Sequence, residues 1–395
     1  MLRGGLRLGK IFGITVSIDW SWFFILILLT WSLAVSVFPT LHPEWSTGLY
    51  WGIGLIAAIL FFLSVLAHEL AHSLVAISKG LPVRRITLYL FGGVSNIERE
   101  PDTPAAEFLT AVVGPLTSII LGVIFLLLGR ASLGDLPGAL SNPTQIIRGL
   151  NPLGTILLWL GPINILLGIF NLIPGFPLDG GRILRSIFWA LTNNLRKATR
   201  WATWIGQLIA WTFIVIGFAM VFGLKIPYFG TGVISGLWLA FIGWFLNNAA
   251  TTSYQRVVIE DMLEGIPVTR LMRVDHPTVT ADTSVADLVD HHFMGTDERA
   301  FPVVEENRLL GLVAMEDVRK VPRADWDNTQ VHAIMTPIEK LEIVSPREDA
   351  FEAFNKLTQK DVRQIPVVQD GKLMGVLRRQ DIMRWLQLHS DAVPG

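Results

Sequence analysis

The chain of 395 residues contains no cysteine and has few charged residues. Without thiols it can form no disulfide, no thiolate nucleophile and no cysteine-ligated metal site, so a metal must be held by His, Asp or Glu. Charged residues make up 16% of the chain and hydrophobic residues 51%, whereas soluble domains have about 25% charged residues. The net charge is −1 and there is no basic stripe, which argues against a nucleic-acid partner. The composition predicts a membrane-embedded protein.

Charge is distributed unevenly along the chain. Residues 1–250 contain 15 basic and 9 acidic residues, whereas residues 251–395 contain 17 and 24. A sparsely charged front followed by a charged tail predicts two domains, a membrane domain over 1–250 and a soluble domain over 251–395.

Long apolar stretches predict about six membrane-spanning helices, because about 20 helical residues cross the hydrocarbon core. Lys and Arg residues gather on alternate connections, so we expect a multi-pass protein of the cell (plasma) membrane with both termini cytoplasmic. Between the second and third stretches, Ile86, Leu88 and Leu90 alternate with other residues at strand period before Gly92-Gly93, which predicts a short β segment or hairpin. The expected spans are about 18–38, 49–78, 104–129, 153–173, 201–222 and 232–249.

The second apolar stretch contains the string His68-Glu69-Leu70-Ala71-His72. Helical residues four apart share a face and are separated by about 6 Å along the axis, so both imidazoles face one point. This geometry suits two zinc ligands, His68 and His72, with Glu69 beside them as a general base. Such strings also arise by chance in helices. Ionisable groups inside a spanning segment are costly unless they bind something, however, which favours the zinc site.

A catalytic zinc site usually has three protein ligands, so a further ligand is required. The candidate is Asp179, which follows the fourth apolar stretch in the segment FNLIPGFPLDGGR. Pro174 and Pro177 break the helix there, and irregular backbone at membrane depth needs protein or a polar cavity to satisfy it. The predicted topology brings Asp179 and the two histidines to one depth near the cytoplasmic face. The alternative is that Asp179 only caps a helix beginning near Gly181.

The tail contains an internal repeat with an offset of 63 or 64 residues. Each copy predicts a helix, a strand (FPVV or IPVV), a turn, a second strand (LLGLV or LMGVL) and a closing helix. The repeat resembles a tandem pair of CBS domains, over about residues 262–322 and 329–388. The matching positions are Met272 and Met335, Pro302 and Pro366, Gly311 and Gly375, and Asp317 and Asp381.

Four motifs occur together in residues 1 to about 230: HELAH, FGG after the predicted strand, AVVGPLTS in the third apolar stretch and NLIPGFPLDGGR after the fourth. Together they resemble the site-2 protease family of intramembrane zinc metalloproteases, in its subgroup with a C-terminal CBS pair. The resemblance implies that His68, His72 and Asp179 bind one Zn2+ and that Glu69 is the base. It also implies that Asn171 supports the scissile carbonyl; alternatively, Asn171 satisfies backbone freed by the nearby proline.

A lipid-embedded helix hides its peptide bonds, so a substrate must unwind locally before attack. An exposed strand edge around residues 86–94 can pair with an extended peptide and supply the hydrogen bonds that lipid cannot. We therefore expect Phe91, Gly92 and Gly93 to contact substrate. The alternative is a strand that only covers the site.

The CBS resemblance implies an adenine nucleotide as ligand and a homodimer as a possible assembly. Asp317 and Asp381 match family positions that hold the ribose hydroxyls, and a carboxylate can accept from both hydroxyls. Where relatives often have Thr or Ser three residues earlier, this chain has Ala314 and Arg378. Arg378 can replace the lost phosphate contact with a charge-assisted one. Alternatively, the two carboxylates cap helices and the module only dimerises or docks.

The sequence thus predicts a polytopic α-helical membrane domain with a short β segment, followed by a soluble α+β CBS module. The predicted function is zinc-dependent hydrolysis of a peptide bond in or near a transmembrane segment of a partner protein, close to the cytoplasmic face. The alternatives are a CBS-gated channel or transporter and an inactive scaffold. A permeation path would require polar residues on several helices, whereas here they concentrate in HELAH and PLDGGR.

Overall fold

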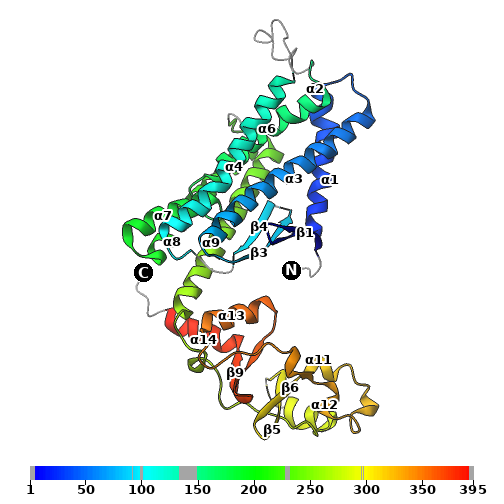
Figure 1. The fold of residues 1–395 in the computed structure, drawn as a ribbon, viewed down its shortest axis with the longest axis vertical. Helices are drawn as coiled ribbons and strands as arrows, with labels where there is room; N and C mark the ends of the chain where they lie inside the picture. Colours follow the sequence, from blue (N-terminus) through cyan, green and yellow to red (C-terminus); the bar gives the residue numbers. More distant parts are fainter. Residues whose placement is uncertain are drawn as a thin grey trace. The chain divides into compact units, whose positions relative to one another are not determined.

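The computed structural model describes residues 5–90, 92–97, 101–132, 149–226, 232–294, 296 and 298–390. The chain divides into two compact units, Met1–Gln255 and Arg256–Gly395 (Figure 1). The first unit contains the predicted membrane segments and the second contains the repeat. The boundary falls inside one continuous helix, α9, which runs past the domain limit expected at residue 250.

Helices dominate the first unit. Six helical segments among the described residues are long and apolar enough to cross a membrane: Trp20–Leu41, Thr47–Ser78, Pro104–Ala131, Pro152–Asn171, Leu195–Val221 and Val233–Leu263. The predicted multi-pass helical fold is confirmed. The named helices are α1 (Trp20–Ser32), α2 (Phe38–Leu41), α3 (Thr47–Ser78), α4 (Pro104–Ala131), α6 (Pro152–Asn171), α7 (Asp179–Thr192), α8 (Leu195–Val221) and α9 (Val233–Leu263), with a π-helical segment Leu33–Val37 between α1 and α2.

Polar residues fix where these helices begin. The side chains of Asp19, Ser46, Thr103 and Asn151 each accept a hydrogen bond from a backbone N–H in the first turn that follows. Such N-caps satisfy donors that have no partner inside the helix. Proline at the start of α4 and α6 loses no helical hydrogen bond there, since the first-turn N–H groups have no intrahelical acceptor.

A four-stranded sheet lies beside α3, in the order β1-β2-β3-β4 (Figure 1). β2 and β3 pair in parallel, while β1–β2 and β3–β4 are antiparallel hairpins. The β3–β4 hairpin is the β segment that the sequence predicts. The N-terminal hairpin was not predicted, although Ile14, Val16 and Ile18 alternate in the sequence and are buried against α3. The strands are β1 (Leu6–Ile11), β2 (Ile14–Ile18), β3 (Val83–Tyr89) and β4 (Gly92–Ile97).

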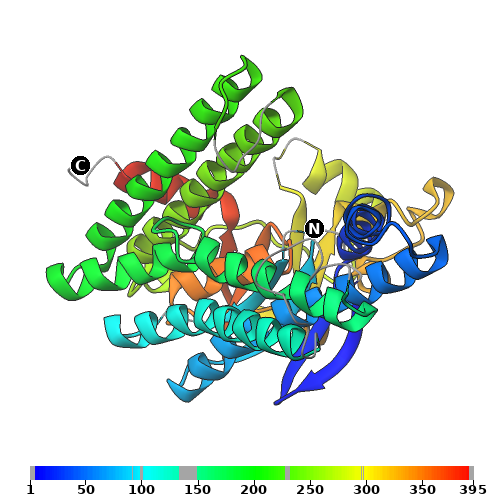
Figure 2. The ribbon, with the colours of Figure 1, turned by 90° about the horizontal axis from the view of Figure 1, so that it is seen from above.

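The helix α4 lies at the centre of the packing around the predicted site. It packs against α3, α6 and α7, while α7 packs in turn on α8. Figure 2 shows α8 and α9 side by side, where Gly217 of α8 meets the backbone of α9. This arrangement brings the predicted HELAH helix and the start of α7 to the same helix, α4.

The second unit has the predicted CBS architecture, with a sheet in the order β5-β6-β9-β8 and β7 paired to β6. The two repeats interlock, because Thr336 pairs with β6 of the first repeat and Arg273 pairs with β9 of the second. Gly311 and Gly375 leave room for these crossing segments. The elements are α10 (Val285–Asp287), β5 (Ala300–Glu305), β6 (Arg308–Ala314), α11 (Met315–Val318), α12 (Val331–Ile334), β7 (Thr336–Pro337), α13 (Ala350–Gln359), β8 (Gln364–Gln369), β9 (Lys372–Arg378) and α14 (Arg379–Ser390).

Candidate functional site

The structure brings His68, His72 and Asp179 together. The two histidines lie one turn apart on α3, and their Nε2 atoms are 3.1 Å apart. Asp179 is the first residue of α7, and its Oδ2 lies 3.1 Å from Nε2 of His68 and 3.2 Å from Nε2 of His72. Residues more than a hundred positions apart therefore meet at one point in the membrane unit.

The spacing of these three atoms fits a tetrahedral zinc site. Ligand atoms about 2.0–2.1 Å from a tetrahedral zinc ion are separated from each other by about 3.3 Å. The three observed separations are 3.1, 3.1 and 3.2 Å. Two imidazole nitrogens and a carboxylate oxygen are also ligand types that zinc accepts, with a fourth position left for water or substrate. The donor set therefore suits a catalytic zinc ion.

Helix α4 orients both histidines through their other ring nitrogens. Nδ1 of His72 donates to the backbone carbonyl of Thr110 at 2.6 Å, which leaves the lone pair of Nε2 available to bind a metal ion. Nδ1 of His68 lies 2.9 Å from Oγ of Ser118. Between these two contacts lies Gly114, where a Cβ atom would collide with His72 and lie 2.8 Å from Nε2 of His68. The AVVGPLTS motif thus supplies Ser118 and the space at Gly114, and Thr110 directly precedes it.

Glu69 faces the edge strand β4. Oγ of Ser95 donates to Oε2 of Glu69 at 2.6 Å. A Cβ atom at Gly93 would lie 3.3 Å from Oε1 of Glu69 and closer to its side-chain carbons, so a larger residue there would displace the Glu69 side chain. The expected base is therefore held by the strand that was expected to contact substrate. The contact from Ser95 was not predicted; its position after the FGG motif was the available signal.

A cavity of about 640 Å³ contains this arrangement. It extends from the two histidines and Asp179 to β4, the end of α6 and α9. Gly92 and Gly93 line it, whereas Phe91 lies outside the described residues. β4 is the last strand on its side of the sheet, so among the described residues its outer edge has no strand partner. The cavity and an open strand edge thus adjoin each other.

Asn171 also lines the cavity, as the last residue of α6. Its Nδ2 donates to the carbonyl of Leu167 at 2.9 Å within the same helix. An amide NH2 group has two N–H donors, so one is still available for another acceptor. The structure thus places Asn171 beside the cavity and shows a local structural bond as well.

A buried ion pair behind the site was not predicted. Glu107 on α4 is fully buried, and Oε1 accepts a hydrogen bond from Nε of Arg185 on α7 at 2.6 Å. Arg182 reaches the same oxygen at 4.0 Å. The signal of this ion pair in the sequence is Glu107, an acidic residue inside an otherwise apolar stretch.

The CBS residues are engaged with neighbouring side chains. Asp317 accepts from the backbone N–H of Ala314 at 3.1 Å, so it caps α11 from within the first turn of that helix and not as the residue before it. Its other oxygen accepts from Lys320 at 2.8 Å and raises the pKa of that amine. Asp381 binds Arg378 through two bonds of 2.7 and 2.9 Å, and these bonds raise the pKa of the guanidinium. Arg378 and Asp381, which were expected to contact phosphate and ribose in the second repeat, thus bind each other.

Comparison with known proteins assigns both units to families. The pattern of peptidase family M50 matches residues 56–215, and the CBS-domain pattern matches residues 268–324 and 331–388. Over 389 residues the chain is 35% identical to sll0528 of Synechocystis sp., covering 98% of this chain and 96% of that protein. Over 395 residues it is 32% identical to Rip3 of Mycobacterium tuberculosis, covering 100% and 95%. Both relatives are named as zinc metalloproteases.

A solved structure that is similar to this chain is the site-2 protease from Methanocaldococcus jannaschii. It is 26% identical, with a TM-score of 0.42, and the match covers 64% of this chain and 95% of that one. The sequence matches extend over nearly the whole chain and include both units. The chain therefore belongs to peptidase family M50, the site-2 proteases, as a multi-pass membrane zinc metalloprotease with a tandem pair of CBS domains.

Proposed function

We propose that His68, His72 and Asp179 bind one Zn2+ and that Glu69 is the general base for hydrolysis of a peptide bond in a membrane-protein substrate. The observation that carries this proposal is the convergence of three ligand atoms within 4.8 Å of one another. Glu69 lies in the same cavity. Family membership disfavours the channel, transporter and scaffold alternatives.

Each residue around the cavity has a separate role in the proposed hydrolysis. His68, His72 and Asp179 would hold a zinc ion, which when bound would supply Lewis-acid chemistry that activates water near neutral pH and polarises the scissile carbonyl. Glu69 takes a proton from the attacking water and delivers it to the leaving nitrogen as the C–N bond breaks. Ser95 holds the carboxylate of Glu69 in position. Asn171 donates its second amide N–H to the carbonyl oxygen as negative charge develops there.

Substrate binding is assigned to the edge of β4. A substrate segment that unwinds can add to this edge as an extra strand, with Gly92 and Gly93 at the point of closest approach and Phe91 preceding them. The support is that the strand edge lines the cavity and directly contacts Glu69. Pairing would align the scissile bond with the base.

The proposed cleavage takes place near the cytoplasmic face of the cell membrane, with both termini cytoplasmic. The support is the distribution of Lys and Arg on alternate connections. We also propose that the CBS pair regulates proteolysis by binding an adenine nucleotide at Asp317 or Asp381, and that it is the surface for a homodimer. In the second repeat a ribose must displace Arg378 from Asp381.

The proposed activity is tested by comparing membrane proteomes of cells that carry the wild-type protein and Glu69→Gln. A full-length membrane protein should accumulate only in cells with the variant. The new terminus that cleavage creates in this protein should appear only in cells with the wild type. Glu44→Gln, which changes an exposed carboxylate outside the cavity, is the matched control. Identical proteomes for the wild type and Glu69→Gln would contradict the proposal.

The ligand assignment has its own test. Asp179→Ala should lower the zinc content of purified protein as well as cleavage, because it removes a ligand. Full zinc content and full cleavage in this variant would show that Asp179 is not a ligand and only caps the helix.

A further inference from the structure

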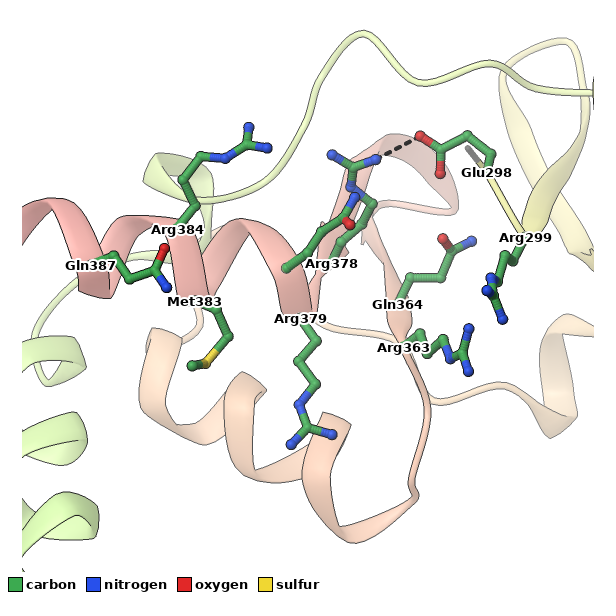
Figure 3. Close-up of a pocket in the computed structure, with 10 residues that line it drawn as sticks. Glu298, Arg299, Arg363, Gln364, Arg378, Arg379, Met383, Arg384 and Gln387 are labelled. Carbon is green, nitrogen blue, oxygen red and sulfur yellow. Dashed lines mark hydrogen bonds and ion pairs between the residues drawn. The ribbon is translucent and has the colours of Figure 1, made fainter. Parts of the chain in front are cut away.

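A second cavity, of about 590 Å³, lies in the CBS unit. Figure 3 shows arginine side chains around it. Arg299 and Arg363 directly precede β5 and β8, so they occupy equivalent positions in the two repeats. Arg379 and Arg384 come from the first two turns of α14. We call this cavity the arginine pocket, lined by Arg299, Arg363, Arg378, Arg379, Arg384 and Glu298 among others.

Only one of these arginines is neutralised within the described part of the chain. Arg378 is buried, binds Asp381 through two bonds and donates to Oε1 of Glu298 at 2.6 Å. For the other four arginines, the described residues include no carboxylate within ion-pair distance. The pocket therefore has an excess of positive charge, which concentrates anions.

The positions of the guanidinium groups indicate the shape of the anion. In Figure 3, Arg299 and Arg363 lie on one side of Arg378, and Arg384 lies on the opposite side. Guanidinium groups bind phosphate oxygens through paired hydrogen bonds. Groups spread along a cavity suit a chain of phosphates better than a single phosphate.

The pairing of Arg378 with Asp381 separates this pocket from a nucleoside site. A ribose that used Asp381 would have to break two charge-assisted hydrogen bonds. An anion bound to Arg363 and Arg379 leaves that pair intact. Phosphate recognition here therefore needs neither of the carboxylates expected to hold ribose.

We propose that the arginine pocket binds a polyphosphate chain, either free or as the tail of a nucleoside triphosphate, and that it recognises phosphates and not the nucleoside. This goes beyond the proposed nucleotide site, because it assigns binding to different side chains and requires no contact with ribose or base.

The test is calorimetric titration of the purified full-length protein in detergent with tripolyphosphate, ATP, AMP and adenosine. Tripolyphosphate and ATP should bind with similar affinity, and both affinities should fall as the salt concentration rises. AMP should compete with tripolyphosphate at least about 10-fold more weakly than ATP does, and adenosine should not compete, because a bond to a charged group accounts for about a tenfold change or more. Competition by adenosine or AMP as effective as that by ATP would overturn the proposal, as would no heat from tripolyphosphate up to millimolar concentration.

Variants separate this pocket from the proposed nucleoside site. Arg363→Gln and Arg379→Gln should each weaken tripolyphosphate binding about 10-fold or more, while Arg347→Gln, an exposed arginine outside the pocket, should not. Asp381→Asn should leave tripolyphosphate binding equal or tighter, because it releases Arg378. If Asp381→Asn abolishes binding while the two pocket variants leave it unchanged, the arginine pocket is not the site. Loss of ATP binding alone in Asp381→Asn would instead support the nucleoside site.

Discussion

The substitution Gly114→Ala should weaken zinc binding while leaving the fold intact. Gly114 lies on α4 directly against the two histidines, and an added Cβ atom would lie 2.8 Å from Nε2 of His68 and closer still to the ring of His72. A Cβ atom in a protein does not pack this close to an imidazole ring, so the imidazoles must move. Both imidazoles are also held from α4 through their Nδ1 atoms. The methyl group therefore opposes the arrangement that places both Nε2 atoms toward one ion.

The size of the effect follows from the cost of overpacking. An extra methyl group in a close-packed site costs about 1–3 kcal/mol. Without metal, the histidines can rotate and relieve this strain, whereas bound zinc requires both nitrogens in place. The strain should therefore appear mainly in metal affinity, as an increase in the zinc dissociation constant of about 5- to 150-fold.

The assay is competition for zinc between the purified protein and a chelator of known affinity. Gly52→Ala is the matched control, because it makes the same change on a membrane helix, α3, where nothing lies within 4 Å of the added atom. That control should bind zinc like the wild type. If Gly114→Ala also binds zinc with wild-type affinity and retains full activity, the metal does not lie between the two histidines.

Three further outcomes are expected. Ser95→Ala removes the hydrogen bond to Glu69, so the turnover of a substrate found in the proteome comparison should fall by about tenfold or more, with unchanged zinc content; unchanged turnover would show that Ser95 does not position the base. Glu107→Gln removes one charge of the buried ion pair with Arg185, which should cost about 3–5 kcal/mol of unfolding free energy, measured by thermal unfolding in detergent, whereas an unchanged midpoint would show that the pair contributes little. A reporter fused near residue 140 should be external and one at residue 395 cytoplasmic; a cytoplasmic signal at 140 would contradict the predicted topology.

Much of the membrane fold could be predicted because its signals are local. Apolar length predicts a spanning helix, and a spacing of four places His68 and His72 on one face. The end of α9 could not be predicted in this way, because the helix continues to Leu263 after its apolar stretch ends. Hydropathy detects the part of a helix that lipid surrounds and not the part that extends beyond it.

Contacts between distant elements were harder to predict. The ion pair of Glu107 and Arg185 depends on how α4 and α7 pack, which neither segment reveals alone. The same holds for Ser95 and Glu69. In the CBS unit, matching Asp381 to a family position could not reveal that Arg378 already occupies its carboxylate. Side chains that satisfy one another across the fold leave no periodic pattern in the sequence.

Zinc content and cleavage activity of purified Glu69→Gln, measured on the same preparation, test the role of Glu69 as the base beside a bound zinc ion. We expect one zinc per chain, as in the wild type, together with loss of cleavage, because Glu69 transfers the proton and does not bind the metal. Cleavage at the wild-type rate by this variant would show that Glu69 is not the base.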